Sequence, residues 1–310
     1  AFAKYGDDCH MPQGTAAYEK RGVATDVPLW TSENCIQCNQ CAFVCPHACI
    51  RPFLCTEEEV NNAPEGAQFL DAVGFKGYKY HLSISTLDCT GCGVCLTVCP
   101  GKPKKNADGT ITKTPALTSH TMAQSKEAKE EAVAQYFLDH VTYKSELAGN
   151  ANAKNVQFAQ PLFEFSGACG GCGETPYVKA VSQLFGDRMM VANATGCTSI
   201  YSGSYPSSPY TTNKEGHGPA WANSLFEDNA EFGFGMRMAV ETLRDRLQTV
   251  MALNMDAMPQ EAKELCQKGI ENRKSGSITK ELAPQIVKAM EAIDAPYAKE
   301  ILSLKDYLVK

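Results

Sequence analysis

The clearest hydrophobic pattern in this 310-residue chain is a strict alternation of apolar and polar positions over residues 78–85. Tyr78, Tyr80, Leu82 and Ile84 would share one face of a β-strand, because successive side chains of a strand point to opposite faces. The pattern therefore predicts a strand with this face in a core. It also places His81 on the outward face, where an exposed histidine is favoured over a metal ligand.

Weaker patterns predict the other elements. Helical periodicity appears over residues 118–147, over 175–185 and over 259–310, the last with breaks at Gly276 and Pro296. An apolar stretch at residues 189–192 predicts a buried strand, and residues 50–54 are extended at best. Residues 1–30 mix glycine, proline and charge without periodicity, which predicts an irregular arm.

Two cysteine runs carry the strongest chemical signal. Residues 35–46 read CIQCNQCAFVCP and residues 89–100 read CTGCGVCLTVCP, so both have the form CxxCxxCxxxCP. Three thiolates at this spacing can wrap one corner of an iron-sulfur cubane, while the fourth, one turn later, points toward a second cluster. The two runs therefore predict two [4Fe-4S] clusters.

Crosswise ligation is expected because the fourth cysteine of each run points away from its own loop. One cluster would be held by Cys35, Cys38, Cys41 and Cys99, and the other by Cys89, Cys92, Cys95 and Cys45. Zinc is the alternative, because CxxC pairs also bind zinc. A triplet with one outlier followed by proline does not match zinc spacing.

The residues between the cysteines differ between the two runs. Gly91 and Gly93 would let the backbone curl so that amide N–H groups aim at cluster sulfurs. The first run has Gln37, Asn39 and Gln40 instead. We therefore expect the two clusters to differ in reduction potential.

A third group of cysteines follows another pattern. Residues 169–174 read CGGCGE, and Cys197 closes a segment that begins with the apolar stretch. A glycine-packed CxxC lets the backbone approach a bulky anionic group. The end of a strand opposite a helix N-terminus is also where α/β folds bind cofactors. Alone this is weak evidence for a metal, and a thioredoxin-like redox pair is the alternative.

These patterns predict two domains. Residues 1–147 would form a ferredoxin-like domain with two [4Fe-4S] clusters and an N-terminal arm, residues 148–160 a linker, and residues 161–310 an α/β domain. The predicted fold class is thus α+β followed by α/β.

Composition narrows the function classes. The formal charge is -6 with no basic patch, so nucleic-acid binding is not expected. No apolar run is long enough to span a membrane. Four of the 15 cysteines lie outside the three groups and are predicted to be ordinary small side chains: Cys9, Cys49, Cys55 and Cys266. Thiols at metal spacing must stay reduced, which predicts the cytoplasm.

Taken together, the chain resembles the pyruvate:ferredoxin oxidoreductases, thiamine-diphosphate-dependent 2-oxoacid enzymes, in their single-chain homodimeric form. The resemblance covers nearly the whole chain. It rests on both cysteine runs and on four further segments, residues 14–22, 170–176, 193–197 and 218–231. It implies that residues 161–310 form part of a thiamine-diphosphate-binding domain that also holds a third, proximal [4Fe-4S] cluster.

The resemblance also implies site residues. Cys169, Cys172 and Cys197 would bind the proximal cluster with a fourth cysteine that Cys266 does not match, and Glu174 and Cys197 would contact thiamine diphosphate. Without the resemblance, Glu174 would simply be a carboxylate favoured by a helix dipole. The GDG motif that binds Mg²⁺ and the diphosphate is absent. We therefore expect a piece of a longer polypeptide that is inactive alone.

The activity implied by the resemblance is oxidative decarboxylation of pyruvate to acetyl-CoA and CO₂, typical of anaerobic metabolism. Electrons would pass through three clusters to ferredoxin or flavodoxin, while pyruvate and coenzyme A bind other domains of a homodimer. No catalytic residue is assigned. The alternatives are a non-catalytic iron-sulfur electron-transfer protein and the same enzyme class acting on another 2-oxoacid.

Overall fold

The computed structural model describes residues 11–106, 108–149, 152–204 and 206–310, and the chain divides into two compact units, residues 1–221 and 222–310. The fold is a mixed α+β arrangement with small sheets. The first ten residues of the predicted irregular arm lie outside the described residues. The predicted linker, residues 148–160, falls inside the first unit, so the domain boundary there remains a prediction from the sequence pattern.

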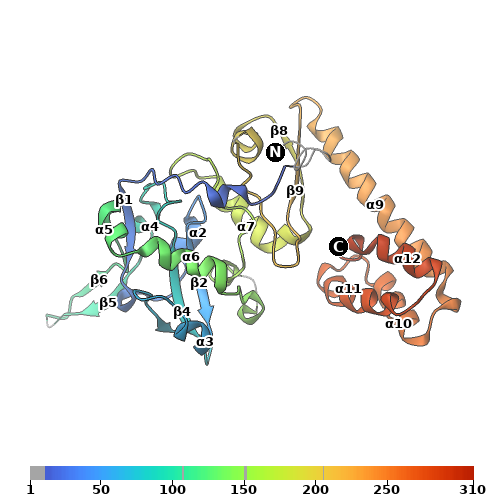
Figure 1. Ribbon diagram of the computed structural model, residues 1–310, viewed down its shortest axis with the longest axis horizontal. Helices are drawn as coiled ribbons and strands as arrows, with labels where there is room; N and C mark the ends of the chain where they lie inside the picture. Colours follow the sequence, from blue (N-terminus) through green and yellow to red (C-terminus); the bar gives the residue numbers. More distant parts are fainter. Residues whose placement is uncertain (1–10, 107, 150–151, 205) are drawn as a thin grey trace. The chain divides into compact units, whose positions relative to one another are not determined.

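A three-stranded antiparallel sheet forms the middle of the first unit (Figure 1). Its order is β2 (Ile50–Cys55), β4 (Lys79–Ile84) and β3 (Leu70–Asp71). The predicted strand is confirmed as β4, and Tyr80, Leu82 and Ile84 are buried as expected. Residues 50–54 are extended as expected and belong to β2, which is buried along its whole length.

The prediction of an exposed His81 was wrong. Its side chain is buried and its ring stacks on Phe137 with centroids 3.7 Å apart. Helix α6 (Glu130–His140) packs on β4 and covers the face that the alternating pattern assigned to solvent. Burial lowers the pKa of His81 to about 4, so the imidazole is neutral at neutral pH.

The single helix predicted over residues 118–147 was also wrong. The segment begins as strand β7 (Leu117–Thr121), continues as α5 (Met122–Glu127) and α6, and breaks between them at Lys129, which has a φ of 55°. Strand β7 pairs antiparallel with β1 (Asp26–Trp30), a strand in the predicted irregular arm. The pairing partner lies about 90 residues away, so local periodicity does not reveal it.

Short elements complete the ferredoxin-like part of the first unit. The hairpin of β5 (Lys102–Lys105) and β6 (Ile111–Thr114) leaves the second cysteine run (Figure 1). The short helices are η1 (Thr15–Tyr18), η2 (Ser32–Asn34), α2 (Gln40–Val44), α3 (Glu57–Asn61), α4 (Val94–Thr97), η3 (Ser145–Ala148) and η4 (Asn155–Phe158).

The rest of the first unit carries the third cysteine group. Helix α7 (Thr175–Phe185) has the predicted bounds. The strand predicted at residues 189–192 is present as β8 (Met190–Ala194), but the prediction that it is buried was wrong, since Met190 is exposed and only Asn193 is buried. The elements that follow α7 and β8 are η5 (Gly186–Arg188), α8 (Cys197–Ser199) and the π-helix η6 (Ile200–Ser204). A small aromatic core of Phe163, Tyr201 and Tyr210 holds this part together.

The second unit is helical. It contains α9 (Asn229–Leu253), η7 (Met255–Ala257), α10 (Gln260–Glu271), α11 (Gly276–Glu291), α12 (Pro296–Ser303) and η8 (Lys305–Tyr307), while β9 (Ala220–Ser224) spans the division. The predicted breaks at Gly276 and Pro296 are confirmed as the first residues of α11 and α12. Leu247, Cys266 and Met290 belong to the core of this unit.

Candidate iron-sulfur sites

The two cysteine loops have matching backbones. Gln37 and Asn39 have left-handed φ angles of 57° and 58°, and Gly91 and Gly93, at the equivalent positions, have 70° and 73°. The Gln37 N–H lies 3.4 Å from the Cys35 sulfur and the Gly91 N–H lies 3.4 Å from the Cys89 sulfur. Amide groups therefore point at a ligand sulfur in both loops, including the loop without glycine.

Side-chain hydrogen bonds hold the left-handed residues of the first loop. The Asn39 amide donates to the Lys154 carbonyl at 3.0 Å and its oxygen accepts from the Tyr80 hydroxyl at 2.8 Å. The Gln37 side chain donates to the Asp71 carbonyl at 2.7 Å and accepts a hydrogen bond from the Val73 N–H at 2.8 Å. Because a non-glycine residue is strained at positive φ, these bonds offset the strain.

Two cavities are each lined by four cysteines of the two runs, three from one run and one from the other. The first has Cys35, Cys38, Cys41 and Cys99 in its wall, and Trp30, Tyr80 and Leu82 supply an apolar surround. The second has Cys45, Cys89, Cys92 and Cys95. These are the same two sets that crosswise ligation combines, although ligation itself stays a prediction.

The thiols around these cavities are shielded from solvent to different degrees. Burial raises the pKa of Cys89 to about 11 and that of Cys95 to about 12, and it raises the pKa of Cys41 well above the usual range. Such thiols are protonated at neutral pH without a metal, so cluster assembly here would release protons.

Cys49 was predicted to be an ordinary side chain, but it lines the same cavity as Cys45. A hydrogen bond from Cys49 lowers the pKa of Cys45 well below the usual range, while burial raises the pKa of Cys49 itself. The Cys49 thiol donates to the carbonyl of His47 at 3.7 Å, so it lies beside the candidate ligand Cys45. Its spacing from Cys45 resembles no metal motif, so no sequence pattern could have identified it.

The glycine-rich CxxC loop contacts the second cysteine loop. A Cβ atom added to Gly171 would lie 3.7 Å from the Cys92 Cβ, and one added to Gly170 would lie 3.5 Å from the Thr90 hydroxyl. His47, two residues after Cys45, donates from Nε2 to the carbonyl of Ala168 at 2.9 Å. The CxxC loop therefore lies against residues that line the cavity of Cys45 and Cys92.

A buried ion pair ties the same two parts together. Arg51 on β2 pairs with Glu164, and both side chains are less than one-tenth exposed. Arg51 also donates to the Tyr143 hydroxyl at 2.9 Å and lies 4.7 Å from the centroid of the Phe165 ring. Breaking such a pair leaves a buried charge uncompensated, so the pair fixes the segment before Cys169 against the sheet.

The third cysteine group is open by comparison. Cys169 and Cys197 are exposed, and Cys172 is half-buried, with its N–H bonded to the Cys169 carbonyl at 3.1 Å. In the described ranges, no group of three or more His, Cys, Asp or Glu side chains is arranged to hold a single metal ion. Cys197 begins the short helix α8 after β8 and is not brought into a three-thiol group with Cys169 and Cys172.

Glu174 occupies the N-cap position of α7, immediately after the CxxC loop. Burial and the nearby carboxylate of Glu174 raise the pKa of Tyr201, and Cys172 contributes in the same direction. Glu174, Cys172 and Tyr201 are therefore neighbours. Buried hydroxyls of Thr175 and Ser166 have no hydrogen-bond partner, and such groups normally have one. These unmatched hydroxyls fit a polar cofactor near the start of α7.

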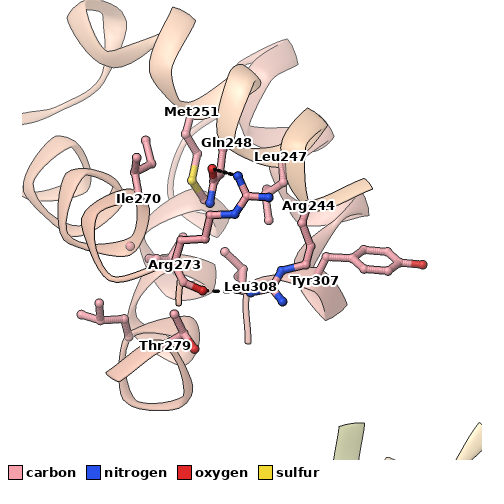
Figure 2. Close-up of a pocket in the computed structure, with 12 residues that line it drawn as sticks. Arg244, Leu247, Gln248, Met251, Ile270, Arg273, Thr279, Tyr307 and Leu308 are labelled. Carbon is pink, nitrogen blue, oxygen red and sulfur yellow. Dashed lines mark hydrogen bonds between the residues drawn. The ribbon is translucent and has the colours of Figure 1, made fainter. Parts of the chain in front are cut away.

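The helical unit has a pocket of its own, shown in Figure 2. Arg244 donates to the Arg273 carbonyl at 3.2 Å, and Arg273 donates to Gln248 at 3.0 Å. Arg273 also pairs with the carboxylates of Glu241 and Asp245. The charge of Arg273 is balanced by these two carboxylates, and none of the predicted site residues lines the pocket.

Comparisons with known proteins agree with this geometry. Residues 34–102 match the model of the 4Fe-4S dicluster domain. The chain is 53% identical over 253 residues to a pyruvate-flavodoxin oxidoreductase of Enterobacter agglomerans, covering 82% of this chain and 20% of the relative. The chain is homologous to a segment of the pyruvate:ferredoxin and pyruvate-flavodoxin oxidoreductases.

Two further relatives support this relationship over a longer stretch. A pyruvate-flavodoxin oxidoreductase of Klebsiella pneumoniae is 46% identical over 308 residues, covering 98% of this chain and 25% of the relative. A pyruvate:ferredoxin oxidoreductase of Moorella thermoacetica is 45% identical over 311 residues, covering 97% and 25%. The chain thus spans about a fifth to a quarter of the length of these oxidoreductases. Within the described residues, none of the helices combines the length and apolarity needed to cross a membrane.

Proposed function

We propose that this chain is the electron-transfer and cofactor-binding segment of a pyruvate:ferredoxin or pyruvate-flavodoxin oxidoreductase. The observation that carries the proposal is the pair of cavities, each lined by four thiols contributed by both cysteine runs. Similarity to oxidoreductases of that name over up to 98% of the chain supports it.

The eight cysteines of the two cavities would hold two [4Fe-4S] clusters crosswise. When bound, the clusters would supply one-electron redox chemistry. The chain's own contribution is to hold the thiols in place and to direct the N–H groups of Gln37 and Gly91 at ligand sulfurs. Trp30, Tyr80 and Leu82 shield the thiols of the first cavity. The potentials of the two clusters would depend on these hydrogen bonds and on nearby charge.

Cys169, Cys172 and Cys197 are proposed as ligands of a third cluster, and Glu174 and Cys197 as contacts of thiamine diphosphate. When bound, this cofactor would supply the carbon chemistry of pyruvate decarboxylation. The neighbouring placement of Glu174, Cys172 and Tyr201, together with the unmatched hydroxyl of Thr175, supports this assignment. The chain matches only part of its relatives, so a fourth cluster ligand and the Mg²⁺ ligands are assigned to the rest of such a protein, as are the sites for pyruvate and coenzyme A.

The contacts also suggest which end of the segment meets the acceptor. The CxxC loop touches the loop of Cys92, while the β5–β6 hairpin leaves the first cavity directly after Cys99. The hairpin is exposed on both strands and carries four lysines, Lys102, Lys104, Lys105 and Lys113. A basic hairpin beside the first cavity would favour binding of an acidic ferredoxin or flavodoxin, since charge complementarity speeds association.

Two further features of the whole protein are part of the proposal. Every described cysteine is a free thiol, which supports a reducing compartment such as the cytoplasm. A homodimer is proposed from the resemblance alone.

The proposal is tested by reconstituting the chain with iron and sulfide under anaerobic conditions. We expect about eight irons and eight sulfides per chain, because two cubanes hold four of each. We also expect no pyruvate-dependent reduction of a viologen dye by the chain alone, and such reduction by a longer protein that contains it. A longer protein that binds the clusters without oxidising pyruvate would favour the alternative, a non-catalytic electron-transfer protein. Oxidation of a different 2-oxoacid would favour the other alternative.

The role of the third group is tested in that longer protein with Cys197→Ser. Serine oxygen is a poor substitute for a soft thiolate on iron. We expect electron delivery to flavodoxin to fall by about 100-fold or more, since even loss of an outer-shell partner costs about 10- to 100-fold, while the KM for pyruvate changes little. Cys266→Ser, in the core of the helical unit, is the matched control. Normal delivery and an unchanged iron content in Cys197→Ser would show that Cys197 is an ordinary thiol.

A further inference from the structure

Lys179 is a buried lysine that contacts α2, the helix between Cys38 and Cys45 of the first cysteine run. It sits on α7, its side chain is only 2% exposed, and its ammonium donates to the carbonyl of Ala42 and, at 3.1 Å, to that of Phe43. Both carbonyls belong to α2. The last carbonyls of a helix have no partner within the helix and favour a cation. Lys179 therefore completes the C-terminal end of α2.

No carboxylate balances this charge. Among the residues that the structure describes, none of the Asp or Glu side chains forms an ion pair with Lys179. The nearby Arg51, by contrast, pairs with Glu164. Burying a charge without a counter-charge is strongly unfavourable, so an anion close to Lys179 would stabilise its charged form.

The segment that Lys179 contacts carries candidate ligands of both clusters, which become anionic when a cluster binds. Burial and the positive charge of Arg51 lower the pKa of Lys179 to about 8, while Cys45, Cys41 and Cys49 act in the opposite direction. Cys41 lies within α2 and lines one cavity, and Cys45 directly follows α2 and lines the other. One ammonium group is therefore close to one candidate ligand from each of the two sets.

We propose that Lys179 is the counter-charge of the two cysteine sites and raises the reduction potential of both clusters, most strongly that of the cluster bound through Cys45. This inference rests on the proposed cluster binding. A cluster with four thiolate ligands gains one negative charge on reduction, and its potential depends on the surrounding charge. A buried cation therefore stabilises the reduced form more than the oxidised form. Lys179 is a positioning and potential-setting residue, since it touches backbone carbonyls and none of the reacting atoms.

The experiment is an anaerobic redox titration of the cluster-loaded chain, followed by electron paramagnetic resonance, with iron and sulfide counted on the same samples. Three variants are compared: Lys179→Gln, whose amide still donates to carbonyls but is neutral, Lys179→Arg, which keeps the charge, and Lys126→Gln, a control that removes an exposed lysine. In Lys179→Gln we expect the ratio of reduced to oxidised Cys45 cluster, at fixed applied potential, to fall roughly tenfold. For one electron this is a shift of about 59 mV to lower potential.

Lys179→Arg should stay near the wild-type potential, and Lys126→Gln should not move it because solvent screens an exposed charge. Equal potentials in wild type and Lys179→Gln, with full iron content in both, would overturn the inference. Loss of loading in Lys179→Gln but not in Lys179→Arg would support it, because assembly would then need the same charge. An equal loss of iron in Lys179→Gln and Lys179→Arg would overturn it, because assembly would then depend on the shape of the lysine side chain and not on its charge. Absence of clusters from the wild-type chain would refute the proposed function instead, so the two failures are distinguishable.

Discussion

The two cysteine loops, residues 35–45 and 89–99, reach one backbone shape by different chemistry. The second loop uses Gly91 and Gly93 at its left-handed positions, which cost little because glycine has no Cβ. The first loop places Gln37 and Asn39 in the same conformation and holds them with hydrogen bonds to Asp71, Tyr80 and other distant groups. The left-handed conformation of the second loop can be predicted from its glycines. That of the first loop cannot, because it depends on hydrogen-bond partners elsewhere in the fold.

The loops also differ in their neighbours. The second loop meets the glycines of the CxxC segment. The first cavity includes Gly101 in its wall and continues into the exposed lysine hairpin. We infer that the second loop, which contains glycine, faces the CxxC segment, where two backbones must approach closely. The first loop, with polar side chains, would lie on the side of the lysine hairpin.

The largest effect on stability is expected at Asn39. Asn39→Ala removes both side-chain hydrogen bonds from a buried site and leaves the Tyr80 hydroxyl and the Lys154 carbonyl unmatched. We expect the free energy of unfolding of the cluster-loaded chain to fall by about 2 to 4 kcal/mol, measured by urea denaturation. Asn39→Gly is the matched control and should recover about 1 kcal/mol of that loss, because glycine relieves the backbone strain. Equal losses in the two variants would contradict this account.

A smaller effect is expected at Gly91. An added Cβ would meet the Ala24 Cβ and the Asp26 carbonyl oxygen at 3.2 Å, while a Cβ on Gly93 would meet nothing within 4 Å. Both positions are left-handed. Gly93→Ala should therefore cost about 1 kcal/mol and Gly91→Ala about 2 kcal/mol. The comparison is made on thermal unfolding of the loaded chain. A larger cost at Gly93 would show that the space around Gly91 is not a constraint.

The smallest effect is expected at the hairpin. Lys104→Glu with Lys105→Glu reverses charge on exposed side chains, so folding should hardly change. Reduction of flavodoxin by the pre-reduced chain should slow by about tenfold at low salt, and the difference should vanish at high salt. Lys268→Glu, on the exposed surface of α10, is the control. If the control slows reduction equally, the hairpin is not the docking surface.

Short sequence motifs predicted the elements whose structure is determined by neighbouring residues in the chain. The cysteine runs, α7, β4 and the breaks at Gly276 and Pro296 all follow from motifs within about a dozen positions. Packing between distant segments decided the rest. His81 is buried because α6 covers β4 from residues 130–140, and the strand at residues 117–121 forms because β1 supplies its partner.

The candidate site shows the same division. The eight cysteines of the cavities could be listed from their spacing, but neither Cys49 nor Lys179 carries a motif. Their placement depends on β2 and α7 packing beside α2. Glu174 and Cys197 came only from the resemblance, because a carboxylate at a helix start and a thiol after a strand have ordinary structural explanations.

Crosswise ligation is the central claim, and pairs of cysteine replacements test it most directly. In Cys99→Ala with Cys38→Ala, both losses fall on one proposed cluster, so about four irons per chain should remain after anaerobic reconstitution. In Cys99→Ala with Cys92→Ala, the losses fall on different clusters, so few or no irons should remain. The opposite result, with one cluster kept in the Cys99/Cys92 pair and none in the Cys99/Cys38 pair, would show that each run binds its own cluster and would contradict the account.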